Sequence, residues 1–205
     1  NSTKLVNLVE VVHSFARKCV NLSIMSNDLP PILIPRASEQ PFERLVYGFA
    51  DTPFGRAIIA FNGVAICALW FCDGNENDTL NALKRDFAAD EYSRDDSRAE
   101  QIVQRIIARQ TSDLILEVEG SEFRLNVWQQ LLSTTSAKTL TYGELTERCG
   151  LVRGAVRAVA SAVASNQIGW IIPCHRIVRS RGDIGRFRWG EERKRAMINW
   201  EKSSK

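Results

Sequence analysis

The sequence predicts an α+β protein in two parts, because three features change partway along the chain. The first part carries a hairpin signal: Asn62-Gly63 favours a two-residue turn and separates apolar stretches at 55–61 and 64–71. Beyond residue 120 the apolar residues recur mainly at helical spacing. The balance of charge changes sign at the same place. We therefore expect a sheet-containing domain followed by a helical one.

The charge asymmetry is hidden in a modest net charge of +3 over 205 residues. Residues 1–119 carry 12 Lys and Arg against 17 Asp and Glu, whereas residues 120–205 carry 15 against 7. A net charge of +8 on the second part favours contact with a polyanion. A basic surface that is merely solvated is the alternative. An apolar content of 44% is enough for one compact core or two small ones.

Several classes of protein are disfavoured by composition. No apolar run approaches the roughly 18 residues of a membrane span, and the N-terminus does not resemble a secretory signal. The five cysteines are scattered and form no C-x-x-C pair, and with two histidines a metal site is not expected. We therefore expect a reducing, cytoplasmic setting without membrane contact, metal or cofactor.

Residues 1–41 are expected to be an N-terminal extension and linker. Residues 1–24 contain one plausible amphipathic helix, with apolar side chains near helical spacing. A proline-rich stretch then has little helical potential; its prolines are Pro30, Pro31, Pro35 and Pro41. The pattern does not decide whether this segment packs on the domain or leads into it flexibly.

Residues 42–119 predict a small αβ domain. Expected strands cover 44–50, 55–61, 64–71 and 114–118. One helix is expected to begin at an Asp78 cap and run to about Phe87, and a longer one to span about 97–110.

Residues 120–205 predict a helix-turn-helix. Ser121 is a candidate helix cap, and Thr141 with Glu144 fits a capping box. The short helix that follows ends near Gly150, and a second is expected over about 154–165. Ordinary helical packing gives the same pattern, so it is the net charge of +8 on residues 120–205 that favours DNA binding by this helix pair.

The most specific stretch is Pro173-Cys174-His175-Arg176. The apolar run 168–172 reads as a short buried strand, which Pro173 is expected to end. Cys174 would then stand at the end of a rigid element, although a free cysteine is often merely buried. His175 is the nearest candidate base. Adjacent side chains seldom point the same way, so direct contact between the two is not guaranteed, and a bridging water would solve that geometry.

This string resembles the active-site motif of the O6-alkylguanine-DNA alkyltransferases. The likeness covers residues 120–201, and the matching positions are Phe123, Val127-Trp128, Thr141-Tyr142-Gly143, Arg157-Ala158-Val159, Asn166, the Cys174 motif, Gly182, Gly190, Lys194 and Glu201. The sequence is most similar to the alkyltransferase half of bacterial adaptive-response proteins, which share Arg188-Trp189-Gly190. The resemblance implies a ribonuclease-H-like αβ domain over 42–119 and a winged-helix or helix-turn-helix DNA-binding domain over 120–205.

The resemblance also implies a reaction. An alkyl group moves once from guanine O6, and from thymine O4, in double-stranded DNA to Cys174 of a monomer, without a cofactor. By this likeness His175 and Glu201 activate the thiol, Tyr142 protonates the leaving base, Asn166 links the recognition helix to the motif, and Lys194 is a further polar member.

Binding residues follow from the same likeness. The second helix carries almost only small side chains, which suits close approach to a narrow groove, and Arg157 would hold the space of a flipped nucleotide. The other expected DNA contacts are Ala158, Ser161, Thr141 and Tyr142. The expected pocket residues are Val163, Ile177, Phe187, Arg188 and Trp189.

Three departures from the family pattern are visible. Phe187 stands where many relatives have tyrosine, Gln167 replaces a proline, and the turn 150–154 is one residue longer than in close relatives. Other classes stay open: a non-catalytic module that binds damaged DNA, a transcription-regulating domain, or a cysteine hydrolase.

Overall fold

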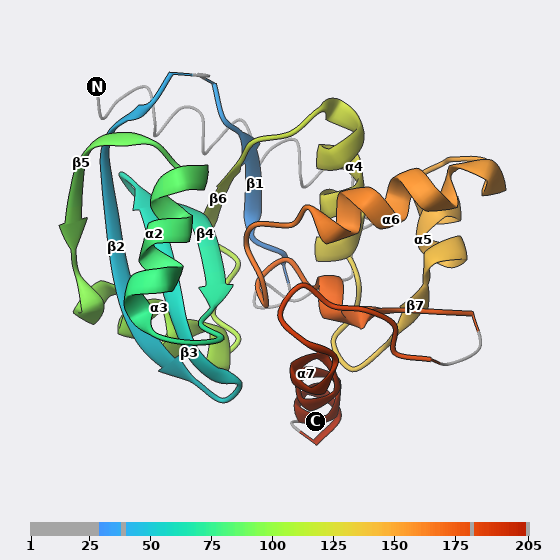
Figure 1. Ribbon diagram of the computed structural model, residues 1–205. Helices are drawn as coiled ribbons and strands as arrows, with labels where there is room; N and C mark the ends of the chain where they lie inside the picture. Colours follow the sequence, from blue (N-terminus) through green and yellow to red (C-terminus); the bar gives the residue numbers. More distant parts are fainter. Residues whose placement is uncertain (1–28, 38–39, 181–182, 204–205) are drawn as a thin grey trace.

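The computed structural model describes residues 29–37, 40–180 and 183–203. It is a mixed α+β structure, which confirms the expected class. A six-stranded sheet with two helices lies on one side and a group of helices on the other, as Figure 1 shows. We call residues 32–118 the sheet region and residues 122–203 the helical region. The helix expected within residues 1–24 lies outside the described residues.

The sheet region is built around an antiparallel meander. Its strands are β1 (Ile32–Pro35), β2 (Phe42–Thr52), β3 (Gly55–Asn62), β4 (Ala65–Phe71), β5 (Ala89–Arg94) and β6 (Ile115–Val118). They lie in the order β1-β6-β4-β3-β2-β5. β2, β3 and β4 pair antiparallel, while β5 joins β2, and β6 joins both β4 and β1, in parallel. The expected hairpin is confirmed, with Gly63 at a φ of +55° in its turn.

Two strands differ from the sequence prediction. Residues 32–35 were expected in a linker but form β1, whose Ile32 N–H donates to the Leu114 carbonyl over 2.8 Å. The aliphatic residues between the prolines find a partner in β6, which is distant in sequence. β5 was not predicted at all, because its sequence ADEYSR has no apolar run and it is half exposed at the sheet edge. Long-range pairing decides both strands.

Two helices flank this sheet. α2 (Glu76–Asp86) is capped by Asn75, whose side chain accepts from the Asp78 N–H, so the predicted Asp78 cap is wrong by one turn. α3 (Asp96–Ile107) begins one residue earlier and ends three earlier than expected. The start of α3 lies directly on Gly48 of β2, where a Cβ atom would collide with the Asp95 backbone. Glycine therefore permits this close packing.

The described part of the helical region holds four α-helices, two 3₁₀ turns and two short strands. They are α4 (Glu122–Leu132), β7 (Leu140–Thr141), α5 (Tyr142–Arg148), the 3₁₀ turn η1 (Arg153–Ala155), α6 (Val156–Ala164), the 3₁₀ turn η2 (Cys174–Arg176), β8 (Ile177–Val178) and α7 (Glu191–Ser203). The Ser121 cap and the capping box of Thr141 and Glu144 are confirmed. α5 and α6 form the expected pair of short helices around the turn at Gly150, whose φ is +73°.

The apolar run at 168–172 is buried but is not a strand, so that prediction is wrong. Only Ile168 makes a bridge, to Leu69 of β4. The Ile171 and Ile172 N–H groups bond back to Gly169 and Ile168, and Trp170 has a φ of +66°. The chain coils here because local hydrogen bonds, described below for Asn166, replace the ladder of a strand. Cys174 consequently begins a 3₁₀ turn.

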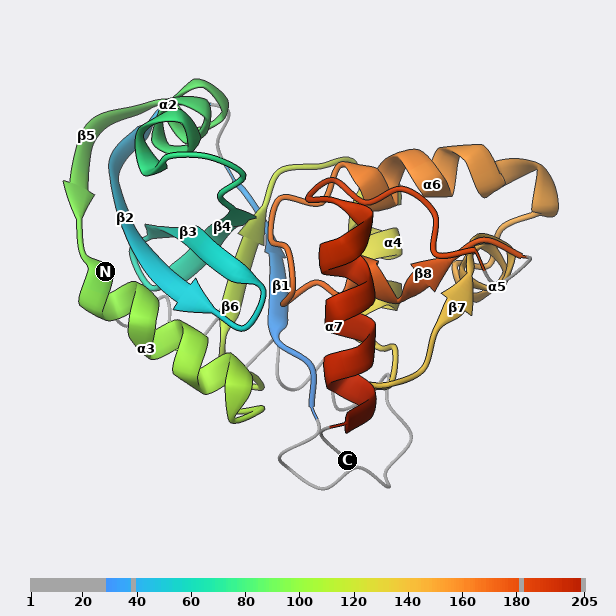
Figure 2. The ribbon, with the colours of Figure 1, turned by 60° about the horizontal axis from the view of Figure 1, so that its bottom comes forward.

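The two regions meet along α7, which runs through the junction in Figure 2. Arg193 of α7 donates to the Phe54 carbonyl over 2.9 Å and pairs with Asp73 over 2.7 Å. The Phe54 ring contacts Trp170 edge-on, with ring centroids 5.2 Å apart. No helix of the described part is both long and apolar enough to cross a membrane.

Candidate active site

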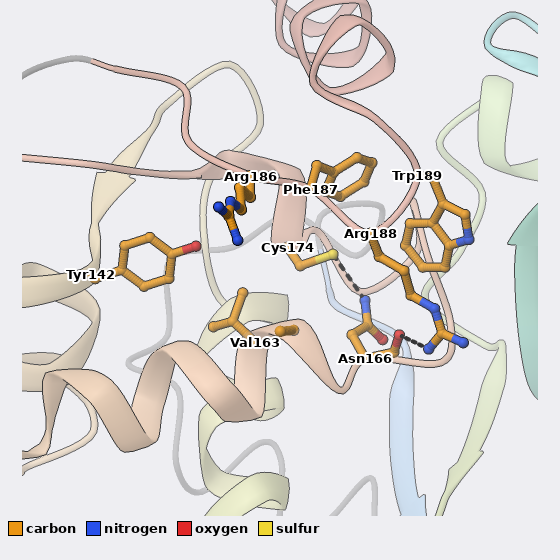
Figure 3. A pocket seen from close by; sticks show the side chains of 9 residues that line it. Tyr142, Val163, Asn166, Cys174, Arg186, Phe187, Arg188 and Trp189 are labelled. Carbon is orange, nitrogen blue, oxygen red and sulfur yellow. Dashed lines mark hydrogen bonds between the residues drawn. The ribbon is translucent and has the colours of Figure 1, made fainter.

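Cys174 lies at a cavity of about 410 Å³ in the helical region. Figure 3 shows its sulfur facing the space between the segment 186–189 and the end of α6. The lining residues are Tyr142, Val163, Ala164, Asn166, Cys174, Arg186, Phe187, Arg188 and Trp189. The cysteine is 5% exposed, so it is reached through this cavity.

Asn166 ties the end of α6 to the cysteine turn. Its side-chain oxygen accepts from the Ile168 N–H, and its amide nitrogen donates to the Ile172 carbonyl over 3.0 Å and to the Cys174 sulfur over 3.1 Å. The residue is 1% exposed, so a buried amide without these bonds would be costly. These bonds connect the end of α6 to the cysteine turn, and one of them reaches the sulfur itself.

Opposing effects act on the pKa of Cys174. Burial raises it above the ordinary value, because a thiolate is poorly solvated there. The Asn166 hydrogen bond and the positive charges of Lys194 and Arg188 act in the other direction. Burial is the largest of these effects, so the resting group is a thiol that needs a base.

His175 and Glu201 form a buried pair behind the cysteine. The His175 Nε2 lies 2.9 Å from the Glu201 Oε1, and the histidine is fully buried. Burial lowers the pKa of His175, and the Glu201 hydrogen bond only partly offsets this, so the ring is neutral. A neutral ring that donates from Nε2 has an acceptor at Nδ1, and within the described residues that atom has no protein partner.

Glu201 is held by more donors than the sequence suggests. Arg176 donates to both of its oxygens over 2.8–3.1 Å, and the Ala137 N–H donates over 3.0 Å. Burial alone would raise the pKa of Glu201, but the bonds from His175 and Arg176 lower it to about 2. Arg176 also donates to the Thr134 carbonyl. Arg176 was not among the predicted site residues, although its position within the motif was a usable signal.

Lys194 is buried beside the site, whereas Tyr142 faces the cavity. Lys194 is 1% exposed and donates to the Ile177 and Ile184 carbonyls, so it anchors the segment that covers the cavity. Burial lowers the pKa of Lys194 to about 8. Tyr142 lines the cavity itself, and burial together with the nearby Cys174 charge raises its pKa.

α6 presents two different faces. Arg157, Ala158 and Ser161 are exposed on one side, and the exposed face consists mainly of small side chains, as the sequence indicates. The opposite face is buried, and the Trp128 indole N–H donates to the Ala162 carbonyl over 2.8 Å. Thr141 is partly buried, and its hydroxyl serves the capping box of α5.

Four of the five predicted pocket residues line the cavity. They are Val163, Phe187, Arg188 and Trp189. Ile177 does not line it, because it is fully buried in β8, paired with Leu140. Arg186 and Ala164 line the cavity and were missed, since neither belongs to a matching family position. Among the described residues no group of three His, Cys, Asp or Glu side chains is placed to hold a metal ion.

Residues 122–203 match the model of the family described as 6-O-methylguanine DNA methyltransferase, DNA binding domain. Over these residues the chain is similar to the DNA-binding domain of that family.

Curated relatives point to the same family. The chain is 37% identical over 161 residues to the bifunctional transcriptional activator/DNA repair enzyme Ada of Escherichia coli, covering 76% of this chain and 45% of that protein. It is 38% identical over 91 residues to a methylated-DNA–protein-cysteine methyltransferase of Mycobacterium tuberculosis, covering 44% of this chain and 54% of that protein. The chain thus spans about half the length of the curated relatives it matches.

Solved structures extend the likeness across both regions. The crystal structure of Mycobacterium tuberculosis O6-methylguanine methyltransferase has a TM-score of 0.63 and 28% identity, covering 78% of this chain and 93% of that chain. A structure of Mycobacterium tuberculosis OGT in complex with DNA has a TM-score of 0.62, covering 77% and 93%.

Proposed function

We propose that this protein repairs DNA by transferring an alkyl group from O6 of guanine, and from O4 of thymine, to Cys174 in a single turnover. The observation that carries this proposal is the Cys174 sulfur at an open cavity, bonded to Asn166 and backed by the buried pair of His175 and Glu201. The proposal includes a monomer that binds double-stranded DNA and a reducing, cytoplasmic setting that keeps the thiol free.

The first step is loss of the thiol proton. In the proposed mechanism a water molecule bridges the Cys174 sulfur and the His175 Nδ1, which is the free acceptor of the neutral ring. The proton passes to His175, and the Glu201 carboxylate, 2.9 Å away, stabilises the cation that forms. Because the pKa of Glu201 is about 2, this carboxylate is ionised at every working pH.

The second step is displacement at the alkyl carbon. The thiolate attacks, a sulfur–carbon bond forms, and the carbon–O6 bond breaks with its electrons left on the base. In this proposal Tyr142, which lines the cavity, gives a proton to the leaving guanine. The thioether has no return path within the site, so each molecule acts once.

The proposed DNA contact is made by α6. The exposed small-residue face of α6 approaches the minor groove, and Arg157 occupies the space of the flipped nucleotide.

The pairing of α5 with α6 supports a winged-helix or helix-turn-helix description of residues 120–205. The meander of β2 to β4 with β5 parallel to β2 supports a ribonuclease-H-like description of residues 42–119.

Mass spectrometry after mixing with excess duplex containing O6-methylguanine tests the chemistry. We expect one added methyl group on Cys174 and no further turnover. The Cys174→Ser variant is expected to bind the duplex without any increase in mass. Binding of DNA by unmodified wild-type protein would instead indicate a non-catalytic module, and sustained turnover would exclude the single-use mechanism.

A second experiment isolates the role of Arg157. Arg157→Ala should slow repair of the duplex more than reaction with the free modified base, since only the duplex requires flipping. Arg195→Ala removes an equal charge from an exposed position of α7 and serves as the control. Equal losses on both substrates would assign Arg157 to the fold or the pocket.

A further inference from the structure

The cavity at Cys174 has an unusual charge for a pocket that receives an alkyl group. Two of its nine lining residues are arginines, Arg186 and Arg188, and none of the nine is acidic. A methyl group needs neither charge, because it is small and apolar. The question is therefore what these two cations contact when a modified base is bound.

Arg186 is the less constrained of the two. Figure 3 shows its guanidinium reaching toward the cavity between the Tyr142 hydroxyl and the Cys174 sulfur. Within the part of the chain that the structure describes, it makes no hydrogen bond or ion pair. By contrast, a carboxylate holds Arg176, through Glu201, and another holds Arg193, through Asp73. Arg186 thus has donors to spare for a ligand.

Arg188 is held at the wall but is not neutralised at close range. Its guanidinium lies over the Trp70 ring at 4.9 Å and the Trp189 ring at 5.6 Å, and a nitrogen lies 3.5 Å from the Asn166 carbonyl. The carboxylate facing it, Asp86, is 4.0 Å away and half exposed. These contacts fix the planar group beside the cavity while its charge stays available.

A carboxylate on the alkyl group would complement this arrangement. Such a substituent would otherwise be repelled by the developing Cys174 thiolate, since both are negative and the sulfur belongs to a residue that is 5% exposed. Two guanidiniums at the wall offset that repulsion and offer charge-assisted hydrogen bonds. A neutral alkyl group gains nothing from them.

We propose that the pocket is selective for O6-alkylguanines whose alkyl group carries a carboxylate, with Arg186 and Arg188 as its partners. This inference rests on the proposed alkyl transfer and names a substrate class for it. The thiolate of Cys174 attacks the methylene carbon, the carbon–O6 bond breaks, and the guanine takes up a proton. The product is S-carboxymethylcysteine, with the carboxylate unchanged throughout.

The test compares single-turnover repair rates for three duplexes of one sequence. They contain O6-carboxymethylguanine, its neutral isostere O6-carbamoylmethylguanine, or O6-methylguanine. Phosphate contacts are the same in all three, so the carboxymethyl-to-carbamoylmethyl rate ratio reports on the alkyl group alone. We expect this ratio to exceed one in the wild type.

Arg186→Gln and Arg188→Gln should each lower that ratio by about tenfold, the size expected when a charge-assisted hydrogen bond is lost. Arg195→Gln, which removes a charge from exposed α7, should leave the ratio unchanged. If both pocket variants slow all three substrates equally, the arginines bind DNA and the inference is overturned. If the wild type repairs none of the three, the proposed function itself fails.

Discussion

The sheet region and the helical region bury different chemistry. All six buried polar or charged residues among those described lie between positions 134 and 201; they are Thr134, Thr146, Asn166, His175, Lys194 and Glu201. The described residues of the sheet region bury apolar side chains only, among them Leu45, Phe49 and Phe61. One region is therefore a conventional apolar core, while the other buries groups that are costly to remove from water.

This difference shows where function resides. A buried charge is tolerated only when it is paired, and Glu201 has His175, Arg176 and the Ala137 N–H as donors. Such a network is a poor way to gain stability but a good way to hold a reactive geometry. The sheet region supplies a rigid support, joined to the network through Arg193 and the aromatic contacts of Phe54.

The largest effect is expected from Glu201→Gln, which breaks the network at its centre. The transfer rate to Cys174 should fall by a factor of about 10²–10⁴, the contribution typical of acid–base groups, because His175 loses the carboxylate that stabilises its cation. Single-turnover methyl transfer measures it. The surface variant Glu147→Gln is the control, and an unchanged rate in Glu201→Gln would remove the pair from the mechanism.

A substitution in the core of the sheet region should instead lower stability and leave the transfer rate nearly unchanged. Phe49 is 1% exposed, so Phe49→Ala should lower the free energy of unfolding by about 3–5 kcal/mol. The rate per folded molecule should stay within about twofold, since no group of the network is touched. Urea unfolding and active-site titration separate the two quantities. A loss of rate at full folding would show that the sheet region takes part in the chemistry.

Acid should act on the helical region through Glu201. Its pKa is lowered to about 2, from an ordinary value near 4.5. A carboxyl with a lowered folded pKa stabilises the fold above its unfolded pKa, and this contribution is lost as the pH falls from about 4.5 toward 2. The shift corresponds to about 3 kcal/mol. Unfolding measured at pH 7, 4 and 3 should show this loss in the wild type and a smaller one in Glu201→Gln.

The smallest predicted effect concerns Trp189, where the two regions meet at the pocket. Its ring contacts Phe71 of β4 edge-on at 5.8 Å and Phe187 at 5.3 Å, and it lines the cavity. An indole wall should admit a methyl group and resist a benzyl group, because packed protein yields little volume. Inactivation by free O6-benzylguanine should therefore be slow, and about tenfold faster in Trp189→Gly.

Trp189→Phe is the companion variant, since it keeps an aromatic contact with Phe71 and should react at an intermediate rate. Equal inactivation rates in all three proteins would mean that the ring does not limit access. In that case Trp189 serves only to join the two regions.

The sequence by itself determined the features that depend on neighbouring residues. The turn at Asn62-Gly63, the capping box at Thr141 and the exposed small-residue face of α6 all follow from spacing of a few positions. Cys174 and His175 were identifiable for the same reason. Local sterics and local hydrogen bonds act within a turn or two, so they can be read from a short stretch of chain.

Only the tertiary structure decided the contacts between distant residues. Glu201 was assigned to His175 by family likeness, but its bonds to Arg176 and Ala137 required the fold. The same holds for β1 and β5, whose partners lie far along the chain, and for Arg186 at the cavity. The run 168–172 was misread because β-branched residues favour a strand, whereas the buried Asn166 amide takes up the backbone groups that a strand would pair.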